Sequence, residues 1–546
     1  MKNLSFLILI ISFFSINAFN CGHNLIKNRP IKIINPIEKE EIRKLQSTKH
    51  YISIYIDYEV LESQLHSGEI NSSYYLNLSL SLNKTVHYFS KILAVNSPKK
   101  LKLSPQLFNT ENDYIIRSEV PYITNNVIET DLILIPKVYF IGEGIDAAAY
   151  AIALSATDNR PVAGGVLLGT HYDFSEKNSQ KFLIMLLLHE ITHVLGFSNG
   201  LFEFFNTNTT LTIKKKINGI DRILFTGNNV LKQAKRHFAC DSIEGVELED
   251  QGGSGSAGSH WEARIMLGDY MISTDYPEIV ISEITLGLLE DSGWYDVNYY
   301  TGGLFRYGKG LGCSFLNNYC VSNGETIYGR EFCVVAGEER CSASNIDRGF
   351  CYITTYSSQL PSYYQYFSDK RKGGFIPADY CPVSISYASQ NYYFYSRCDS
   401  NGKNMNNVNP IFGEIYGNNS ICILSSLSPK NYSIISKKQS RCHEIQCDNI
   451  TRTFTIDIGD VLLNCSGVYE EVSVTGYSGS IICPDYNRVC TGSVWCNDPL
   501  DCIDNNSLYD EADDTSVANV TSKDIGMWFN KKDILKWILT FGYIIF

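Results

Sequence analysis

NSQKFLIMLLLHEITHVLG, residues 178–196, is the stretch of sequence that decides the fold. It is long enough for about five turns of α-helix, with Asn178 or Ser179 as the expected N-cap and Gly196 where a helix would end. Its nearly continuous apolar character predicts a helix that is buried on most sides. The stretch therefore predicts the central helix of a globular domain.

Two histidines and a glutamate stand in the middle of this apolar helix. His189, Glu190 and His193 have the spacing H-E-x-x-H, which places both imidazoles on one helical face. Two such imidazoles can share one zinc ion, and the adjacent carboxylate can take a proton from a bound water. Two buried histidines with ordinary hydrogen bonds are the alternative, but polar groups in an apolar helix destabilise it unless they are satisfied together. The pattern predicts one catalytic Zn²⁺ ion with Glu190 as the general base.

Catalytic zinc usually takes three protein ligands, so this motif is one ligand short. Position 199, where a compact zinc motif would place a third histidine, is Asn. Downstream, His237 lies in the charged run KQAKRHF, His443 lies among cysteines, and His260 ends the flexible run GGSGSAGSHWE. Met271 follows His260 by eleven residues, and a Met in a turn near the zinc is the second mark of metzincins.

Two segments together, HEITHVLGF (189–197) and SHWEARIMLGDYMIS (259–273), closely resemble the leishmanolysin family of zinc metalloproteases. Members of that family separate the second and third zinc histidines by an insert, which here would be residues 197–259. The resemblance implies a metzincin-like catalytic domain that acts on protein or peptide substrates. It implies His189, His193 and His260 as zinc ligands, Glu190 as general base and Met271 as the Met-turn residue.

Three other segments are expected to be strands. Residues 50–60 alternate apolar and polar side chains, and residues 130–142 and 162–169 are apolar runs. Strands followed by one central helix favour an α+β fold. The expected architecture is a metzincin-like catalytic domain with a central active-site helix, followed by a cysteine-rich, disulfide-stapled C-terminal domain.

The cysteines divide the chain unevenly. Of 17, 15 lie between Cys313 and Cys502, which predicts a cross-linked zone with little continuous core in an oxidising compartment. The family resemblance implies that Cys240 pairs with Cys313, which leaves an even set of 16 and one odd cysteine, Cys21. FNCGHN, around Cys21, resembles the family's prosegment, in which a thiolate holds the open zinc position. An ordinary disulfide cysteine is the alternative for Cys21.

Both ends of the chain carry apolar segments. Residues 1–18 have the order of a secretory signal peptide, and ten N-x-S/T sequons agree with a secreted glycoprotein. From residue 533 an apolar tail fits either a GPI-attachment signal, and so possible membrane attachment, or a terminal amphipathic helix. A net charge of −12 without a basic face excludes nucleic acid as an expected partner.

The expected organisation is a signal peptide (1–18), a propeptide with the cysteine switch (19–47), a catalytic region (48–312), a cysteine-rich domain (313–510), and a polar spacer with a hydrophobic tail (511–546). Two functions fit it. The first is a secreted or cell-surface zinc endopeptidase that is synthesised as a zymogen. The second is a catalytically silent adhesion glycoprotein that binds through its cysteine-rich zone.

Overall fold

The structure is a computed structural model. It describes residues 21–23, 31–34, 49–96, 100–108, 114–170, 173–175, 180–251, 257–274, 280–301, 305–343, 345–386, 396–398, 412–417, 419–431, 437–448, 450–459 and 461–490. The predicted signal peptide, the C-terminal tail and the expected N-cap at residue 178 or 179 lie outside these residues. Glycosylation and the division of the chain into domains stay predictions.

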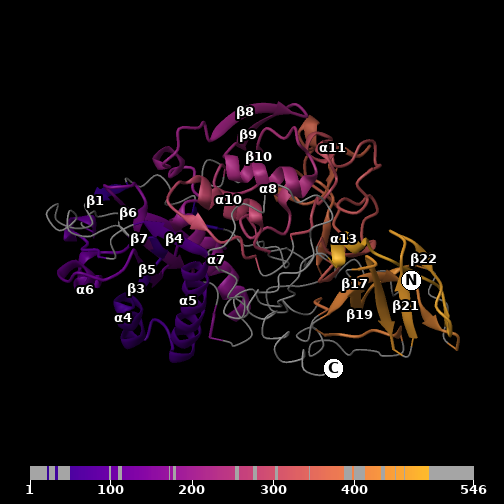
Figure 1. The fold of residues 1–546 in the computed structure, drawn as a ribbon, viewed down its shortest axis with the longest axis horizontal. Helices are drawn as coiled ribbons and strands as arrows, with labels where there is room; N and C mark the ends of the chain where they lie inside the picture. The colour runs from indigo at the N-terminus through magenta and orange to yellow at the C-terminus, as the bar shows by residue number, and fades with distance from the viewer. Residues whose placement is uncertain are drawn as a thin grey trace, which may run out of the picture.

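A five-stranded mixed sheet forms the N-terminal part (Figure 1). In spatial order its strands are β1 (Lys32–Ile34), β6 (Ala147–Ser155), β7 (Pro161–Leu168), β5 (Leu132–Val138) and β3 (Ile54–Ile56). β6 runs antiparallel to β7, whereas the other neighbouring pairs are parallel. The strands predicted within 130–142 and 162–169 are confirmed.

The prediction of one strand over residues 50–60 is wrong. The chain there forms two three-residue strands, β2 (Lys49–Tyr51) and β3, which belong to different sheets, and helix α4 (Glu59–Ser67) begins directly afterwards. β2 pairs with β4 (Leu93–Asn96), which also pairs with β11 (Asp296–Val297). The apolar residues of the alternating pattern therefore pack in two different sheets and not on one face of a single long strand.

Helix α7 (Gln180–Leu195) is the predicted central helix, and its existence is confirmed. It packs against β6, β7 and a second long helix, α5 (Ser72–Ile92), which begins where the Asn71 side chain accepts a hydrogen bond from the Tyr74 backbone N–H. Gly164 of β7 allows the close approach, because a Cβ there would lie 2.4 Å from Cγ1 of Val194. The helix therefore packs directly on the face of the sheet that β6 and β7 form.

The expected insert folds into a small layer of its own. It contains β8 (Thr212–Ile217), β9 (Ile220–Phe225), helix α8 (Asn228–Phe238) and β10 (Val246–Glu247), in the sheet order β10-β9-β8. Helix α10 (Glu283–Asp291) packs against α8. The remaining helices of this half are α6 (Pro121–Asn125) and α9 (Ala263–Met266).

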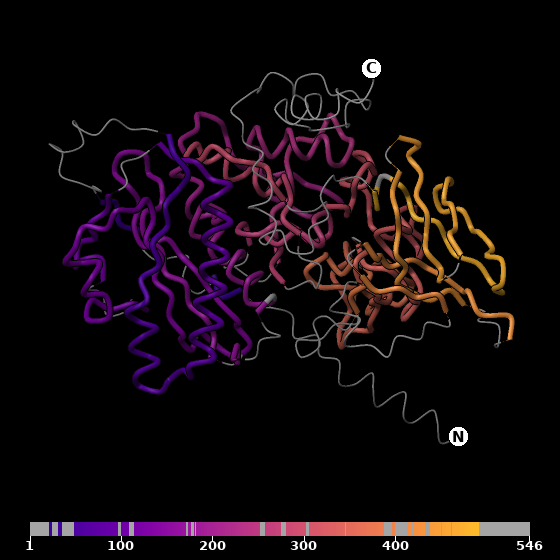
Figure 2. The backbone as a smooth tube through the Cα atoms, turned by 60° about the horizontal axis from the view of Figure 1, so that its bottom comes forward, coloured from indigo at the N-terminus to yellow at the C-terminus, as the bar shows by residue number. Residues whose placement is uncertain are grey.

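Beyond residue 312 the elements are short until a six-stranded antiparallel sheet forms at the far end of the molecule from the first sheet, drawn in yellow in Figure 2. The short elements are α11 (Cys313–Asn317), β12 (Glu339–Cys341), β13 (Arg348–Cys351), β14 (Thr354–Thr355), β15 (Lys372–Gly373) and β16 (Ser384–Ser386). The large sheet contains β17 (Ser420–Ser425), β19 (Gln439–Asp448), β20 (Thr453–Ile458), β21 (Val461–Cys465), β22 (Glu471–Val472) and β24 (Ile481–Ile482). A small pair, β18 (Ser428–Pro429) with β23 (Tyr477–Ser478), and helix α13 (Tyr486–Val489) complete this part.

Seven disulfides join described cysteines. They are Cys240–Cys313, Cys320–Cys381, Cys333–Cys351, Cys341–Cys422, Cys398–Cys442, Cys447–Cys490 and Cys465–Cys483. The Cys240–Cys313 pairing implied by the family resemblance is confirmed, and it joins the insert to the cysteine-rich segment. Cys21 is buried and unpaired, as the odd cysteine count predicts. Disulfides at this density indicate an extracellular protein.

The apolar cores match this arrangement. One core fills the space between the first sheet, α5, α7 and the insert and continues to Ile385, and a second core covers the opposite face of that sheet. The C-terminal sheet has a separate core. Among the described residues there is no helix with the length and apolar character needed to span a bilayer.

Candidate metal centre

The buried end of α7 carries the H-E-x-x-H residues. His189, Glu190 and His193 lie in its last two turns, and each is at most 3% exposed. The helix ends at Leu195, and the following Gly196 and Phe197 both donate backbone hydrogen bonds to the carbonyl of Thr192. The helix therefore ends just before Gly196, where the sequence predicted its end.

Backbone carbonyls orient both imidazoles of the helix. The Nδ1–H of His189 donates to the carbonyl oxygen of Tyr270 at 2.7 Å, and the Nδ1–H of His193 donates to that of Phe197 at 2.7 Å. Because a carbonyl oxygen only accepts, Nδ1 carries the proton in each ring, so Nε2 is the nitrogen that carries the lone pair. This is the arrangement that the outer partners of metal-binding histidines usually impose.

His260 joins the two helical histidines although it is 71 residues from His189. Its Nε2 lies 3.2 Å from Nε2 of His189, which in turn lies 3.1 Å from Nε2 of His193. The two other histidines downstream lie elsewhere: His237 donates to the Tyr307 carbonyl, and His443 bonds to that of Gly413 inside the C-terminal sheet. The structure thus brings together the three histidines that the family resemblance implies.

The three Nε2 atoms fit a zinc ion. Ligands of a tetrahedral zinc with Zn–N bonds of 2.0–2.1 Å lie about 3.3 Å apart, close to the separations here. Burial lowers the pKa of His189 to about 4 and that of His193 well below its usual value, so both rings are neutral. Neutral lone pairs that face each other at 3.1 Å repel unless a cation lies between them. The donor set is therefore suited to a metal ion.

The insert positions His260. The Glu249 backbone N–H donates to the carbonyl of His260, and the Glu262 N–H donates to that of Glu247, so the end of β10 and the two residues after it pair with the histidine segment. Beneath this pairing, two buried arginines contact a group of carboxylates. Arg222 pairs with Glu247, Asp250, Glu262 and Asp379, and Arg264 pairs with Glu247 and Asp379. Asp379 belongs to the cysteine-rich segment, so the network fixes the His260 segment against both neighbouring parts.

Met271 lies in a buried turn that contacts both ligand-bearing segments. Its carbonyl accepts the Trp261 N–H, while its own N–H donates to Asp269, whose carboxylate also accepts from Thr285. The preceding residue, Tyr270, bonds to His189 through its carbonyl and contacts the Thr192 hydroxyl through its own. The turn therefore links the His260 segment to α7, where the sequence predicted a Met-turn.

The segment around Cys21 covers the three histidines. Sγ of Cys21 lies 3.4 Å from Nε2 of His193. This sulfur and one ring nitrogen from each of the three histidines, the atoms that could bind a metal, all lie within 4.8 Å of one another. Gly22 donates its N–H to the Ala147 carbonyl on β6, and a Cβ at Gly22 would lie only 2.7 Å from Ile145. A glycine is needed there for the segment to lie this close to the strand.

His23 holds the same segment from its other side. Its ring stacks on His193 with centroids 4.2 Å apart, Nδ1 bonds to the Ala149 carbonyl at 2.8 Å, and Nε2 bonds to the Ser198 hydroxyl at 2.8 Å. His23 was not predicted as a site residue, although its place two residues after Cys21 was the available signal. Tyr270 and Ser198 were missed as well, because they act through long-range contacts.

Glu190 is fully buried beside the cysteine. Neither of its carboxylate oxygens makes a well-formed hydrogen bond to a described residue. Burial raises the pKa of Glu190 to about 8, although the nearby Cys21 thiol and the Ala149 backbone N–H act to lower it. The thiol of Cys21 is also affected, since burial and the nearby Glu190 raise its pKa well above the usual value. A buried carboxylate without a well-formed hydrogen bond is a group prepared to accept one from a water or a ligand.

Comparison with known proteins agrees with this geometry. A family model described as leishmanolysin matches residues 82–496, which is more than half of the chain. The chain belongs to the leishmanolysin family. The resemblance found in the sequence is thereby confirmed.

Several family members are similar to this leishmanolysin-family chain. The leishmanolysin of Leishmania tropica is 27% identical over 393 residues, which cover 68% of the chain and 56% of that protein. The leishmanolysin of Leishmania major is 27% identical with 62% of its length covered, and a leishmanolysin-like peptidase of Caenorhabditis elegans is 28% identical with 65% covered. The chain therefore spans less than two thirds of the length of these curated relatives.

Proposed function

We propose that this chain is a secreted or cell-surface zinc endopeptidase that is synthesised in a latent form. The observation that carries the proposal is the convergence of three histidine Nε2 atoms beside a buried glutamate that makes no well-formed hydrogen bond to a described residue. His189, His193 and His260 would hold one zinc ion. When bound, zinc would acidify a water molecule and polarise the carbonyl of the peptide bond to be cleaved.

Glu190 is the proposed general base and acid. It follows the first histidine on the helix, so its carboxylate lies at the side of the three nitrogens, where it can take a proton from the attacking water. It would then pass that proton to the nitrogen of the leaving amine. Met271 would support the site as the Met-turn residue, through the turn that binds both His189 and the His260 segment.

The prosegment is proposed to cause latency through Cys21. With Sγ beside the histidines, a thiolate would occupy the open zinc position and exclude the water that Glu190 needs. A second attachment supports the first, because β1 pairs in parallel with residues Ala153–Ser155 of β6. The outer edge of β6 that Cys21, Gly22 and β1 contact would become available to an extended peptide after their removal.

A catalytically silent adhesion glycoprotein is the second function considered. Its support is the cysteine-rich part alone, which can bind a partner whether or not the protein is an enzyme. The presence of Glu190 together with all three histidines favours the peptidase, since loss of any one would abolish the chemistry.

Chelation of the metal tests the proposed function. Treatment of processed protein with 1,10-phenanthroline is expected to abolish the hydrolysis of casein, because the three histidines alone cannot activate water. Added Zn²⁺ should restore the activity, and the metal content measured by mass spectrometry should return to one zinc per chain. Casein hydrolysis that persists in metal-free protein would contradict the proposal and favour the adhesion function.

Replacement of His23 tests the hold on the prosegment. His23→Ala removes two hydrogen bonds and a ring contact, which together contribute about 1–3 kcal/mol to the latent state. The casein-hydrolysing activity of uncleaved protein is therefore expected to rise roughly tenfold to a hundredfold. His66→Ala, which changes an exposed histidine on α4, is the matched control and should leave latency unchanged. Unchanged latency in His23→Ala would show that Cys21 holds the segment without His23.

A further inference from the structure

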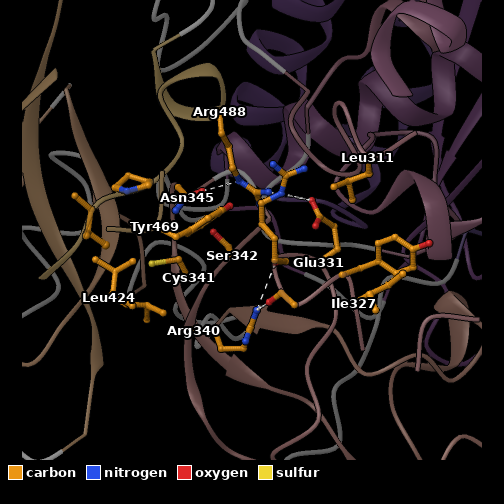
Figure 3. A pocket seen from close by; sticks show the side chains of 16 residues that line it. Leu311, Ile327, Glu331, Arg340, Cys341, Ser342, Asn345, Leu424, Tyr469 and Arg488 are labelled. Carbon is orange, nitrogen blue, oxygen red and sulfur yellow. Dashed lines mark hydrogen bonds and ion pairs between the residues drawn. The ribbon is translucent and has the colours of Figure 1, made fainter. Parts of the chain in front are cut away.

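A cavity of about 470 Å³ lies between the cysteine-rich segment and the C-terminal sheet (Figure 3). Residues 327–331, 340–342 and 345 form one side, and β17, β24 and Arg488 of α13 form the other. The disulfide Cys341–Cys422 joins the two sides. The cavity is therefore held open by a covalent link, and its size is that of pockets that bind small molecules. It contains none of the residues of the proposed metal centre.

Positive charge predominates in the cavity wall. Arg330, Arg340 and Arg488 line it, whereas Glu331 is the only acidic residue among the described residues of the lining. Glu331 is already shared by two of the arginines, because its Oε1 accepts from Nε of Arg330 at 2.8 Å and from Nη1 of Arg488 at 2.9 Å. Figure 3 shows Arg488 beside Glu331, with Arg340 at the opposite, lower side of the view. The Oε1 atom of Glu331 is therefore engaged by arginines other than Arg340.

Arg340 is the least compensated of the three guanidinium groups. It donates to the backbone carbonyl of Gly329, and its Nε is buried without a hydrogen-bond partner. Its ion pair with Glu338 is long, at 3.7 Å, and the Glu338 side chain is half exposed to solvent. Burial lowers the pKa of Arg340 more than Glu338 and Glu331 raise it. Because its pairing with Glu338 is long and partly exposed, an anion beside Arg340 would add to a charge that the protein itself compensates only in part.

The remainder of the lining is mainly apolar. Leu311, Ile327, Ile423, Leu424 and Ile482 contribute aliphatic side chains, and Ile327 is 81% exposed. Tyr469, which is half exposed, lines the same cavity. An occupant thus meets aliphatic walls together with a guanidinium group, which favours a molecule with one anionic end and one apolar part.

We propose that this cavity binds a carboxylate that is joined to a short apolar group. A peptide C-terminus with an apolar last side chain and a short fatty acid both have this chemistry. A guanidinium group pairs with a carboxylate through two parallel hydrogen bonds, while aliphatic walls take up the apolar part. The cavity shares no lining residue with the metal centre, so a failure to bind the carboxylate and a failure to hydrolyse peptides are separate results.

Calorimetric titration of the full-length Glu190→Gln protein tests the site without self-cleavage. The probes are acetyl-Ala-Ala-Leu with a free carboxylate, the same peptide as its amide, and sodium octanoate. We expect saturable binding of at least one carboxylate, with the peptide amide bound about tenfold more weakly than the peptide acid if the source is a peptide end. Binding of octanoate alone would identify the fatty-acid source.

Two variants locate the binding. Arg340→Gln is expected to weaken it at least about tenfold, whereas Arg371→Gln, an exposed arginine outside the cavity, should not change it. Ile327→Asp adds a repelling charge at an exposed lining position, so it weakens binding without threatening the core. The proposal is overturned if neither the peptide acid nor octanoate saturates the protein, or if Arg340→Gln and Ile327→Asp both bind like the parent. It is also overturned if zinc removal abolishes binding.

Discussion

Replacing Glu190 with Gln is expected to reduce kcat/KM for a peptide substrate by about 10²–10⁴-fold, the usual contribution of a general base. The substitution keeps the size of the side chain and removes the carboxylate that would accept a proton from water. The Cys21→Ala background is used for this measurement, because Cys21 covers Glu190 in the latent form. Zinc content should stay at one ion per chain, since Glu190 is not among the proposed ligands.

A matched control separates loss of the base from loss of the fold. Glu203 is an exposed glutamate in a short 3₁₀ turn after α7, and Glu203→Gln should retain the parent activity. A Glu190→Gln protein with normal zinc content and undiminished kcat/KM would contradict the proposed role of Glu190. Loss of zinc from this variant would instead indicate that the carboxylate helps to hold the metal site together.

The parts of the fold that the sequence predicted well are those with a strong local pattern. The helix containing His189 and His193 combines a long apolar run with a glycine at its end, and β5 and β7 are apolar runs of strand length. Helix α5 shows the opposite case. Residues 76–82 alternate leucine with polar residues, a period typical of a strand.

The structure nevertheless places residues 76–82 in a helix. Leu78 and Leu82, four residues apart, are fully buried, whereas Leu76 and Leu80 are about half exposed. Packing against α7 therefore decided the conformation of this segment, because it buries one helical face and leaves the other in solvent. The alternation of leucine and polar residues along the sequence does not reveal this packing against α7.

The residues of the candidate site also divide into those that local spacing predicts and those that only long-range contacts bring together. Spacing alone brings together His189, Glu190 and His193, because four residues make one helical turn. His260 reaches them only through the pairing of the insert with its own segment, a contact that no local pattern encodes. The family resemblance supplied that third histidine. His23 and Tyr270 were missed for the same reason, since their partners Ser198 and Thr192 are far away in the sequence.

Replacing Cys21 with Ala is expected to make the uncleaved protein active, with casein hydrolysis raised well over tenfold above the latent parent. Loss of a thiolate ligand removes several kcal/mol of stabilisation from the closed state, and each 1.4 kcal/mol corresponds to about a factor of ten. His23 and β1 would still hold the segment to β6, so activation should be incomplete until residues 19–47 are removed.

A spectroscopic measurement makes this prediction independent of activity. Cobalt-substituted parent protein should show a thiolate-to-cobalt charge-transfer band in the near ultraviolet, and Cys21→Ala should lack it, because Cys21 is the one unpaired cysteine among the described residues. A mercurial reagent should activate the parent and leave the variant unchanged. If the variant stays latent while the cobalt band disappears, Cys21 binds the metal but the pairing of β1 with β6 is what blocks the substrate. A band that persists in the variant would exclude Cys21 as the metal ligand.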